Sequence, residues 1–188
     1  MNTLLINLFM QHEQWVKSMG KEGKQLIVKD QDLSDAKLAN RELVSSVFLD
    51  VRLDHSDLRA ADLSYSNLGY SSFKRADLGG VTIIKAEADH VDFEAATISN
   101  MNAFRTTFIG ASFRNAILTG VNFSRCQLDH SDFSGAVVSG CCFFEAGLRS
   151  ILGLESMTVD WIDVGPEDRP HKLYGIQGIE WLLEASKK

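Results

Sequence analysis

The sequence predicts a solenoid, and two observations predict it. Every fifth residue from Leu33 to Leu148 is apolar, at 24 positions with no slip in register. The residue two places before most of these positions is small, usually Ala, Ser or Cys. Neither the 3.6-residue period of a helix nor the two-residue period of a strand gives this pattern. A short unit repeated without interruption indicates stacked coils around a narrow core.

The repeat unit resembles the consensus of the bacterial pentapeptide-repeat family, roughly Ala-(Asp/Asn)-Leu-X-X. The closest matches are Ala61-Asp62-Leu63, Ala76-Asp77-Leu78, Ser56-Asp57-Leu58 and Ser131-Asp132-Phe133. The resemblance implies an all-β solenoid, a right-handed quadrilateral β-helix with about twenty residues in each coil. It also implies a mostly non-enzymatic protein, since some members bind DNA gyrase by mimicking duplex DNA and many have no known role.

A phenylalanine series supports the twenty-residue coil independently. Phenylalanine recurs at Phe73, Phe93, Phe113 and Phe133. Residues twenty apart would stack at the strand spacing of about 4.8 Å, so about six coils make a rod roughly 29 Å long. Such a thin rod has no deep cleft, which disfavours a buried active site.

The chain divides into three predicted parts. Residues 1–29 form an N-terminal capping helix, over residues 2–19, and a linker. Its apolar face would be Leu4, Leu5, Leu8, Phe9, Trp15 and Val16, with Gly20 as the stop. Residues 30–152 form the β-helix. Residues 153–188 lose the repeat phase and form a short strand near Trp161, a charged turn and an amphipathic helix over 176–185, which acts as a cap or a dimer contact.

Three residues break the repeat rule. Arg41 occupies a small inward position, where an unpaired guanidinium would be costly, and this predicts a distorted first coil. Ala88 and Ala103 are undersized for central positions, and Met101 is placed to fill the gap.

One side of the predicted coil carries an unusual set of outward residues. The central positions of this side, face three, are Leu43, Leu63, Ile83, Ala103, Phe123 and Phe143. The residues that follow these positions include an apolar column and a basic column. We call this set the face-three surface: Ile84, Lys85, Phe104, Arg105, Arg125 and Phe144. Exposed apolar side chains beside arginine are typical of a partner-binding surface, although arginine stems or the C-terminal tail could instead cover them.

The sequence predicts no catalytic, cofactor or metal site. It lacks nucleophile-elbow, phosphate-loop and zinc-protease motifs. The Asp-His pairs 54–55, 89–90 and 129–130 lie too far apart for one ion, and the repeat aspartates are expected to support turns. Cys126 and Cys141 are expected inside the core and Cys142 outside, with no disulfide framework.

These features predict a non-catalytic protein-binding module or scaffold, of which an inhibitor or immunity protein is one version. The alternative is a DNA mimic that binds a type II topoisomerase. Against it, residues 31–150 hold 11 basic residues beside 15 acidic ones. A net charge of −6 disfavours direct nucleic-acid binding. The apolar stretch Leu4–Met10 is too short to span a membrane, so we expect a cytoplasmic protein whose partner is another protein or a second copy.

Overall fold

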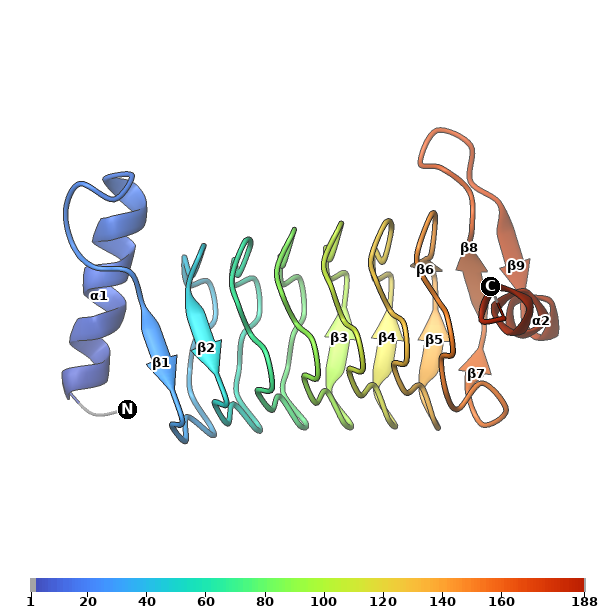
Figure 1. Ribbon diagram of the computed structural model, residues 1–188, viewed down its shortest axis with the longest axis horizontal. Helices are drawn as coiled ribbons and strands as arrows, with labels where there is room; N and C mark the ends of the chain where they lie inside the picture. The colour runs from blue at the N-terminus through green and yellow to red at the C-terminus, as the bar shows by residue number, and fades with distance from the viewer. Residues whose placement is uncertain (1–2, 188) are drawn as a thin grey trace.

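A computed structural model describes residues 3–187 of the chain. These residues form a β-solenoid of about seven turns with a helix at each end (Figure 1). The helices are α1 (Thr3–Lys17) and α2 (Ile176–Ala185). The solenoid is about one turn longer than the sequence predicts, because paired strands lie before Leu33 and after Leu148.

Parallel pairing between residues twenty apart builds the coils. Ile27 pairs with Val47 at one end of the rod, and Ile117 pairs with Val137 near the other. Between the strands, single parallel bridges such as Asp57 with Asp77 continue the same register. The strands are β1 (Ile27–Lys29), β2 (Val47–Leu49), β3 (Thr97–Ser99), β4 (Ile117–Thr119), β5 (Val137–Ser139), β6 (Cys141–Cys142), β7 (Thr158–Val159), β8 (Trp161–Asp163) and β9 (Lys172–Tyr174).

Each coil turns its corners with a left-handed residue at every fifth position. Residues such as Asn40 (φ 60°), Tyr65 (φ 60°) and Lys85 (φ 54°) adopt this conformation, which costs a non-glycine residue free energy. The aspartate before each centre accepts a hydrogen bond from the backbone N–H two residues later, as Asp57 does from Arg59 and Asp92 from Glu94. The same bond forms at Asp62, Asp77 and Asp132. The predicted turn role of these five aspartates is confirmed.

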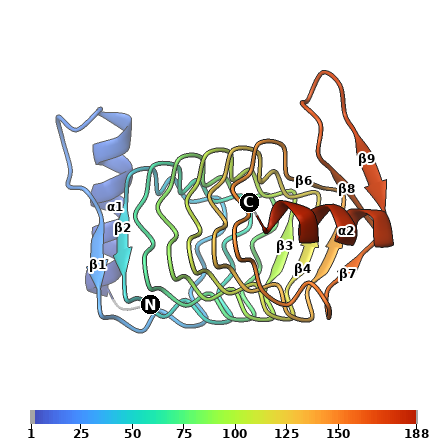
Figure 2. The same cartoon turned by 45° about the vertical axis from the view of Figure 1, so that its right-hand side comes forward.

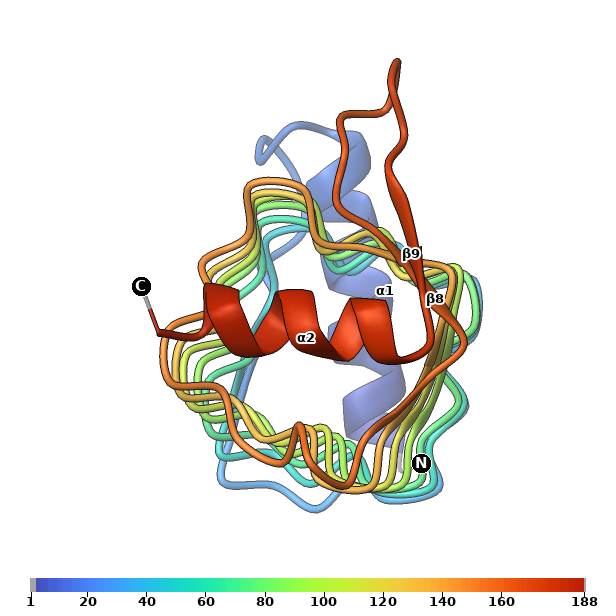
Figure 3. The same cartoon turned by 90° about the vertical axis from the view of Figure 1, so that its right-hand side faces the viewer.

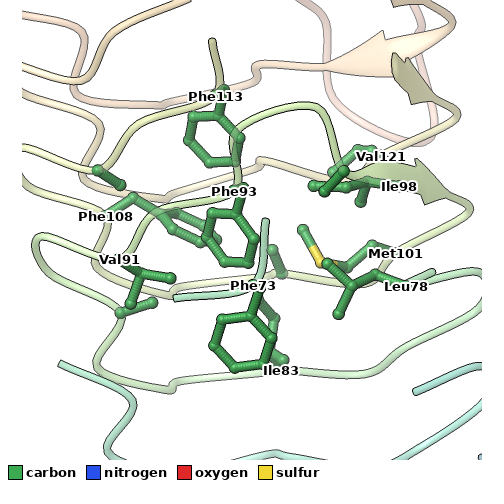
Figure 4. Close-up of a cluster of buried hydrophobic side chains, with 14 of the residues drawn as sticks. Phe73, Leu78, Ile83, Val91, Phe93, Ile98, Met101, Phe108, Phe113 and Val121 are labelled. Atoms are coloured by element: carbon green, nitrogen blue, oxygen red, sulfur yellow. The ribbon is translucent and has the colours of Figure 1, made fainter. Parts of the chain in front are cut away.

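The central positions fill the core as predicted. Phe73, Phe93, Phe113 and Phe133 are at most 2% exposed. Their rings stack along the axis with centroid separations of 5.5, 5.2 and 4.9 Å, and Figure 4 shows the first three rings. Met101 is buried beside Leu78 and Ile98 (Figure 4), and both undersized alanines are also fully buried.

Helix α1 covers the first coil, and the covered face differs from the predicted one. Phe9 and His12 are fully buried, whereas Leu8 is 37% exposed. Leu5, Trp15 and Val16 are partly buried, as predicted, so the covered side of the helix gains His12 and leaves Leu8 exposed. Gly20 takes φ 83° after the last helical turn, so the predicted stop is confirmed.

The predicted distortion of the first coil at Arg41 is wrong. The Arg41 side chain extends to α1, where its guanidinium forms an ion pair with Glu13 and lies 5.7 Å from the centre of the Phe9 ring. The backbone beside it keeps the normal ladder, since the Leu43 N–H donates to the Asp62 carbonyl at 2.8 Å. The ion pair with Glu13 of α1 accommodates the Arg41 charge, and the path of the first coil does not change.

The apolar repeat ends after Leu148, as the sequence predicts, but the twenty-residue register of the coils continues to Leu152, and a one-residue insertion interrupts it only before Thr158. Asp132 pairs with Leu152, twenty residues on, but Val137 pairs with Thr158, twenty-one residues on. The chain then forms an antiparallel hairpin of β8 and β9 that projects from the rod (Figure 2). Helix α2 finally crosses the C-terminal end of the four-sided coil (Figure 3). Strand β9 has no counterpart in the sequence prediction.

Candidate protein-interaction surface

The six residues of the face-three surface line one corner of the solenoid. Each coil contributes the two residues that follow its face-three centre, and the second of each pair adopts the left-handed conformation. Ile84, Phe104 and Phe144 are partly buried, whereas Lys85, Arg105 and Arg125 are exposed. The parallel ladder therefore places the apolar and the basic side chains in two adjacent columns. The three basic residues lie one coil apart at each step, whereas Ser124 separates Phe104 from Phe144 in the apolar column.

Backbone hydrogen bonds hold this corner in place from coil to coil. The Lys85 N–H donates to the Phe104 carbonyl at 3.0 Å, and the Arg105 N–H donates to the Ser124 carbonyl at 3.1 Å. The Arg125 N–H donates to the Phe144 carbonyl at 2.8 Å. The surface is consequently presented on a rigid backbone, which lowers the entropy lost on binding.

The basic side chains lie against aromatic rings. The guanidiniums of Arg105 and Arg125 lie 5.1 and 5.9 Å from the centre of the Phe104 ring. The Lys85 ammonium lies 5.4 Å from the centre of the Tyr65 ring, a residue that the sequence prediction did not include. These cation–π contacts cover part of Phe104 and orient the cations along the corner.

Two of these cations have no acidic partner among residues 3–187. Arg125 forms an ion pair with Glu145 at 2.6 Å, but neither Lys85 nor Arg105 has a carboxylate within 4 Å. Elsewhere on the solenoid, several basic residues bind carboxylates on the same or the neighbouring coil, although Lys37 and Arg75 also form no ion pair among the described residues. Such pairs join Arg52 to Asp32, Arg59 to Asp57, Lys74 to Glu94, Arg114 to Asp132 and Arg149 to Asp129. The face-three surface therefore keeps a local positive charge.

The aspartates of the three Asp-His pairs accept hydrogen bonds from the backbone. The carboxylates of Asp54, Asp89 and Asp129 accept hydrogen bonds from N–H groups of the next coil, at 3.1, 2.9 and 2.8 Å. His90 stacks on Tyr70 with centroids 4.9 Å apart. Within the described residues, no group of three metal-ligating side chains is arranged to hold an ion.

The cysteines occupy the expected positions. Cys126 and Cys141 are buried, Cys142 is partly exposed, and all three are free thiols. Burial raises the pKa of Cys126 and of Cys141 to about 12, so both stay protonated at neutral pH. The Cys126 thiol donates to the Ala103 carbonyl, as the Ser66 hydroxyl does to Leu43. These groups act as small core residues that also satisfy a turn carbonyl.

Hollows in the surface lie at the ends of the rod. One lies beside α1 and is lined by Leu5, Leu8 and residues 31–37. Another lies between α2 and the last coils, beside Trp181 and Arg149. No helix within residues 3–187 is long and apolar enough to cross a membrane.

This geometry defines a β-helical repeat protein with a patterned outer surface. A family model for pentapeptide repeats matches eight copies, at residues 61–100 and 106–143. Within residues 61–143 the chain therefore carries repeats of the kind that this family model describes. No curated protein has a sequence that matches this chain significantly.

Solved structures that are similar to this chain include three proteins. HetL, which is involved in heterocyst differentiation regulation in the cyanobacterium Nostoc, is 19% identical with a TM-score of 0.52 and covers 79% of this chain and 71% of its own. A trypsin-treated form of QnrB1, a plasmid-mediated fluoroquinolone resistance protein, is 16% identical with a TM-score of 0.46 and covers 69% and 79%. A protein from the cyanobacterium Cyanothece is 18% identical with a TM-score of 0.44 and covers 57% and 80%. The likeness to HetL shows the fold alone.

Proposed function

We propose that this chain is a non-catalytic protein-binding module that uses the face-three surface. A scaffold, an inhibitor and an immunity protein are all versions of this function. The observation that carries the proposal is the pairing of partly buried apolar residues with two cations, Lys85 and Arg105, that lack acidic partners in the described chain. Apolar anchors and arginine supply most of the affinity in protein interfaces, and charge steers the encounter.

The chemistry of the surface specifies the partner class. An acidic, partly apolar protein surface would supply carboxylates to Lys85 and Arg105 and an apolar side chain against Phe104. The cation–π contacts already fix Arg105 over the Phe104 ring, so little side-chain freedom is lost on binding.

The test compares five baits, the wild type and four variants, in capture experiments from a native cell lysate. The wild type should retain a protein that Phe104→Ala loses at any salt concentration and that Arg105→Glu loses most strongly at low salt. Two matched controls lie on other faces: Arg75→Glu removes another exposed cation, and Ile117→Ala truncates a side chain that is 50% exposed. Both controls should capture the protein as the wild type does.

Two results would contradict the proposal. If the face-three variants capture the same proteins as the wild type, within about threefold in affinity, or roughly 0.6 kcal/mol, the surface is not an interface. If the control variants lose the captured protein equally, the effect is not specific to this corner. Thermal melting of each variant verifies that its fold is intact.

The alternative function is that of a DNA mimic that binds gyrase. It requires a continuous acidic surface, and the ion pairs between neighbouring coils do not favour one. The basic face-three surface has the opposite sign to duplex DNA.

A further inference from the structure

The outward side of α2 carries a second patch of exposed apolar and acidic side chains. Ile176 is 65% exposed and Leu183 is 42% exposed, and Glu180 is exposed between them. These three residues are spaced four and three apart, so they share one stripe of the helix. Tyr174, which immediately precedes the helix, is 57% exposed. We call Tyr174, Ile176, Glu180 and Leu183 the α2 stripe.

The opposite side of α2 fixes the helix to its own solenoid. Leu182 is 1% exposed, and Gly178 lies against Val159 and Ile162 so closely that an added Cβ would be 3.1 Å from the Val159 side chain. At the end of the helix, the Ser150 N–H donates to the Ser186 carbonyl at 2.9 Å. The α2 stripe therefore stays at the end of the rod (Figure 3). It cannot reach Phe104 or Arg105 of its own chain, which lie two coils before the coil of Phe144.

The α2 stripe and the face-three surface complement each other in charge and in apolar content. Glu180 forms no ion pair among the described residues, and Lys85 and Arg105 likewise lack a carboxylate. Ile176 and Glu180 are separated by about 6 Å along the helix. Lys85 and Arg105 are separated by one coil, about 4.8 Å. A helix laid along the corner could thus place its carboxylate near either cation and Ile176 or Leu183 against Phe104.

We infer that a second copy of this chain docks its α2 stripe on the face-three surface, so that copies associate end to side. This inference rests on the proposed function, because it names the partner of the same surface. The contact is heterologous: each copy offers one helix and one corner, and successive copies extend an open chain. A symmetric pairing of two α2 helices is disfavoured, because it would bring the Glu180 carboxylates of both copies together.

Sedimentation velocity over about a hundred-fold range of concentration tests the inference. The wild type should gain mass with concentration without stopping at a dimer, and high salt should weaken the association. Arg105→Glu and Glu180→Arg should each weaken it by about tenfold or more, and the double variant Arg105→Glu/Glu180→Arg should recover it, because the two charges are exchanged. Arg75→Glu, the matched control, should associate as the wild type does.

A mixing experiment identifies the heterologous geometry. The Arg105→Glu variant keeps an intact α2 stripe but has an altered face-three surface. The Ile176→Asp variant keeps an intact face-three surface but has an altered α2 stripe. Each variant alone should be monomeric, and an equimolar mixture should form a one-to-one dimer and nothing larger. If Arg105→Glu alone still dimerises, the contact is between two α2 helices and the inference is wrong.

Two further results would overturn the inference that copies associate end to side. A wild type that stays monomeric at all concentrations overturns the inference, and so does a double variant that melts like the wild type but stays monomeric. Neither result contradicts the proposed function, because that function is tested separately by the capture of another protein by the same surface. Loss of both activities in the face-three variants would show that self-association and partner capture share one site.

Discussion

At the scale of single residues, the repeat assigns each side chain a direction and often a hydrogen bond. The turn role of Asp57 and its equivalents was predictable, because a short carboxylate beside a tight turn bonds the backbone locally. The role of Asp89 was not predictable in this way, since its partner is the N–H of Ile109 in the next coil. The pair between Arg41 and Glu13 joins residues 28 apart and depends on where α1 docks.

The stacked rings make the core sensitive to truncation. Phe113 contacts Phe93 and Phe133 along the axis and meets Phe108 edge-on at 5.5 Å. Phe113→Ala should therefore lower the free energy of unfolding by about 3–5 kcal/mol. Ala103→Leu adds volume beside the flexible Met101 and should cost less, about 1–3 kcal/mol.

Urea unfolding of the two variants and the wild type measures both effects. Ala88→Leu serves as a second enlargement, since Ala88 is also fully buried. If the truncation and the enlargements lower the free energy of unfolding equally, Met101 cannot adjust. The middle of the rod is then as tightly packed as the phenylalanine stack.

At the scale of elements, helices were more predictable than strands at the C-terminal end. The helix over 176–185 was predicted at its observed bounds because its apolar residues recur at helical spacing. Strand β9 has only three residues, of which only Leu173 is partly buried, so its sequence has no alternating pattern. The register shift before β7 depends on one added residue, which the sequence shows only as a loss of phase.

The N-terminal cap contains a histidine whose neutral form is required. The His12 Nδ1 accepts a hydrogen bond from the Leu26 N–H at 3.0 Å, and the Leu26 carbonyl accepts one from Val47 at 2.9 Å. His12 is fully buried and stacks on Trp15, and burial lowers the pKa of His12 below its ordinary value of 6.5. The Glu13 carboxylate acts in the opposite direction on the pKa of His12, but burial is the larger effect. An imidazolium could not accept the Leu26 bond.

The cap should therefore loosen in acid. The unfolded chain binds the His12 proton more readily than the folded one, so this contribution to stability is complete above about pH 6.5 and falls as the pH drops below it. His12→Asn keeps an acceptor near Leu26 but does not titrate. Its melting temperature should fall less than that of the wild type between about pH 7.5 and about pH 5.5. Parallel pH curves would show that His12 does not control the cap, since both proteins share every other histidine.

At the scale of the whole molecule, ion pairs between coils distribute charge evenly along most of the rod. Lys74 bridges Asp92 and Glu94 of the next coil at 2.9 Å, and Arg114 binds Asp132 at 3.0 Å. The sequence could not show which cations remain without partners, because that depends on side-chain reach across coils. The structure distinguishes Arg125, which is paired, from Arg105, which is not.

This charge distribution gives a definite expectation for gyrase. A DNA mimic must present continuous negative potential to a DNA-binding groove. Here the carboxylates of Asp57, Asp92 and Asp132 already bind cations, and the face-three surface is positive. The protein should leave the yield of supercoiled plasmid unchanged when added in molar excess to a gyrase assay, and Lys85→Glu/Arg105→Glu should behave in the same way. If the wild type inhibits gyrase and the more acidic variant inhibits it more strongly, DNA mimicry would be established. The argument for the face-three surface would then fail, because its positive charge would be weakening the binding to gyrase.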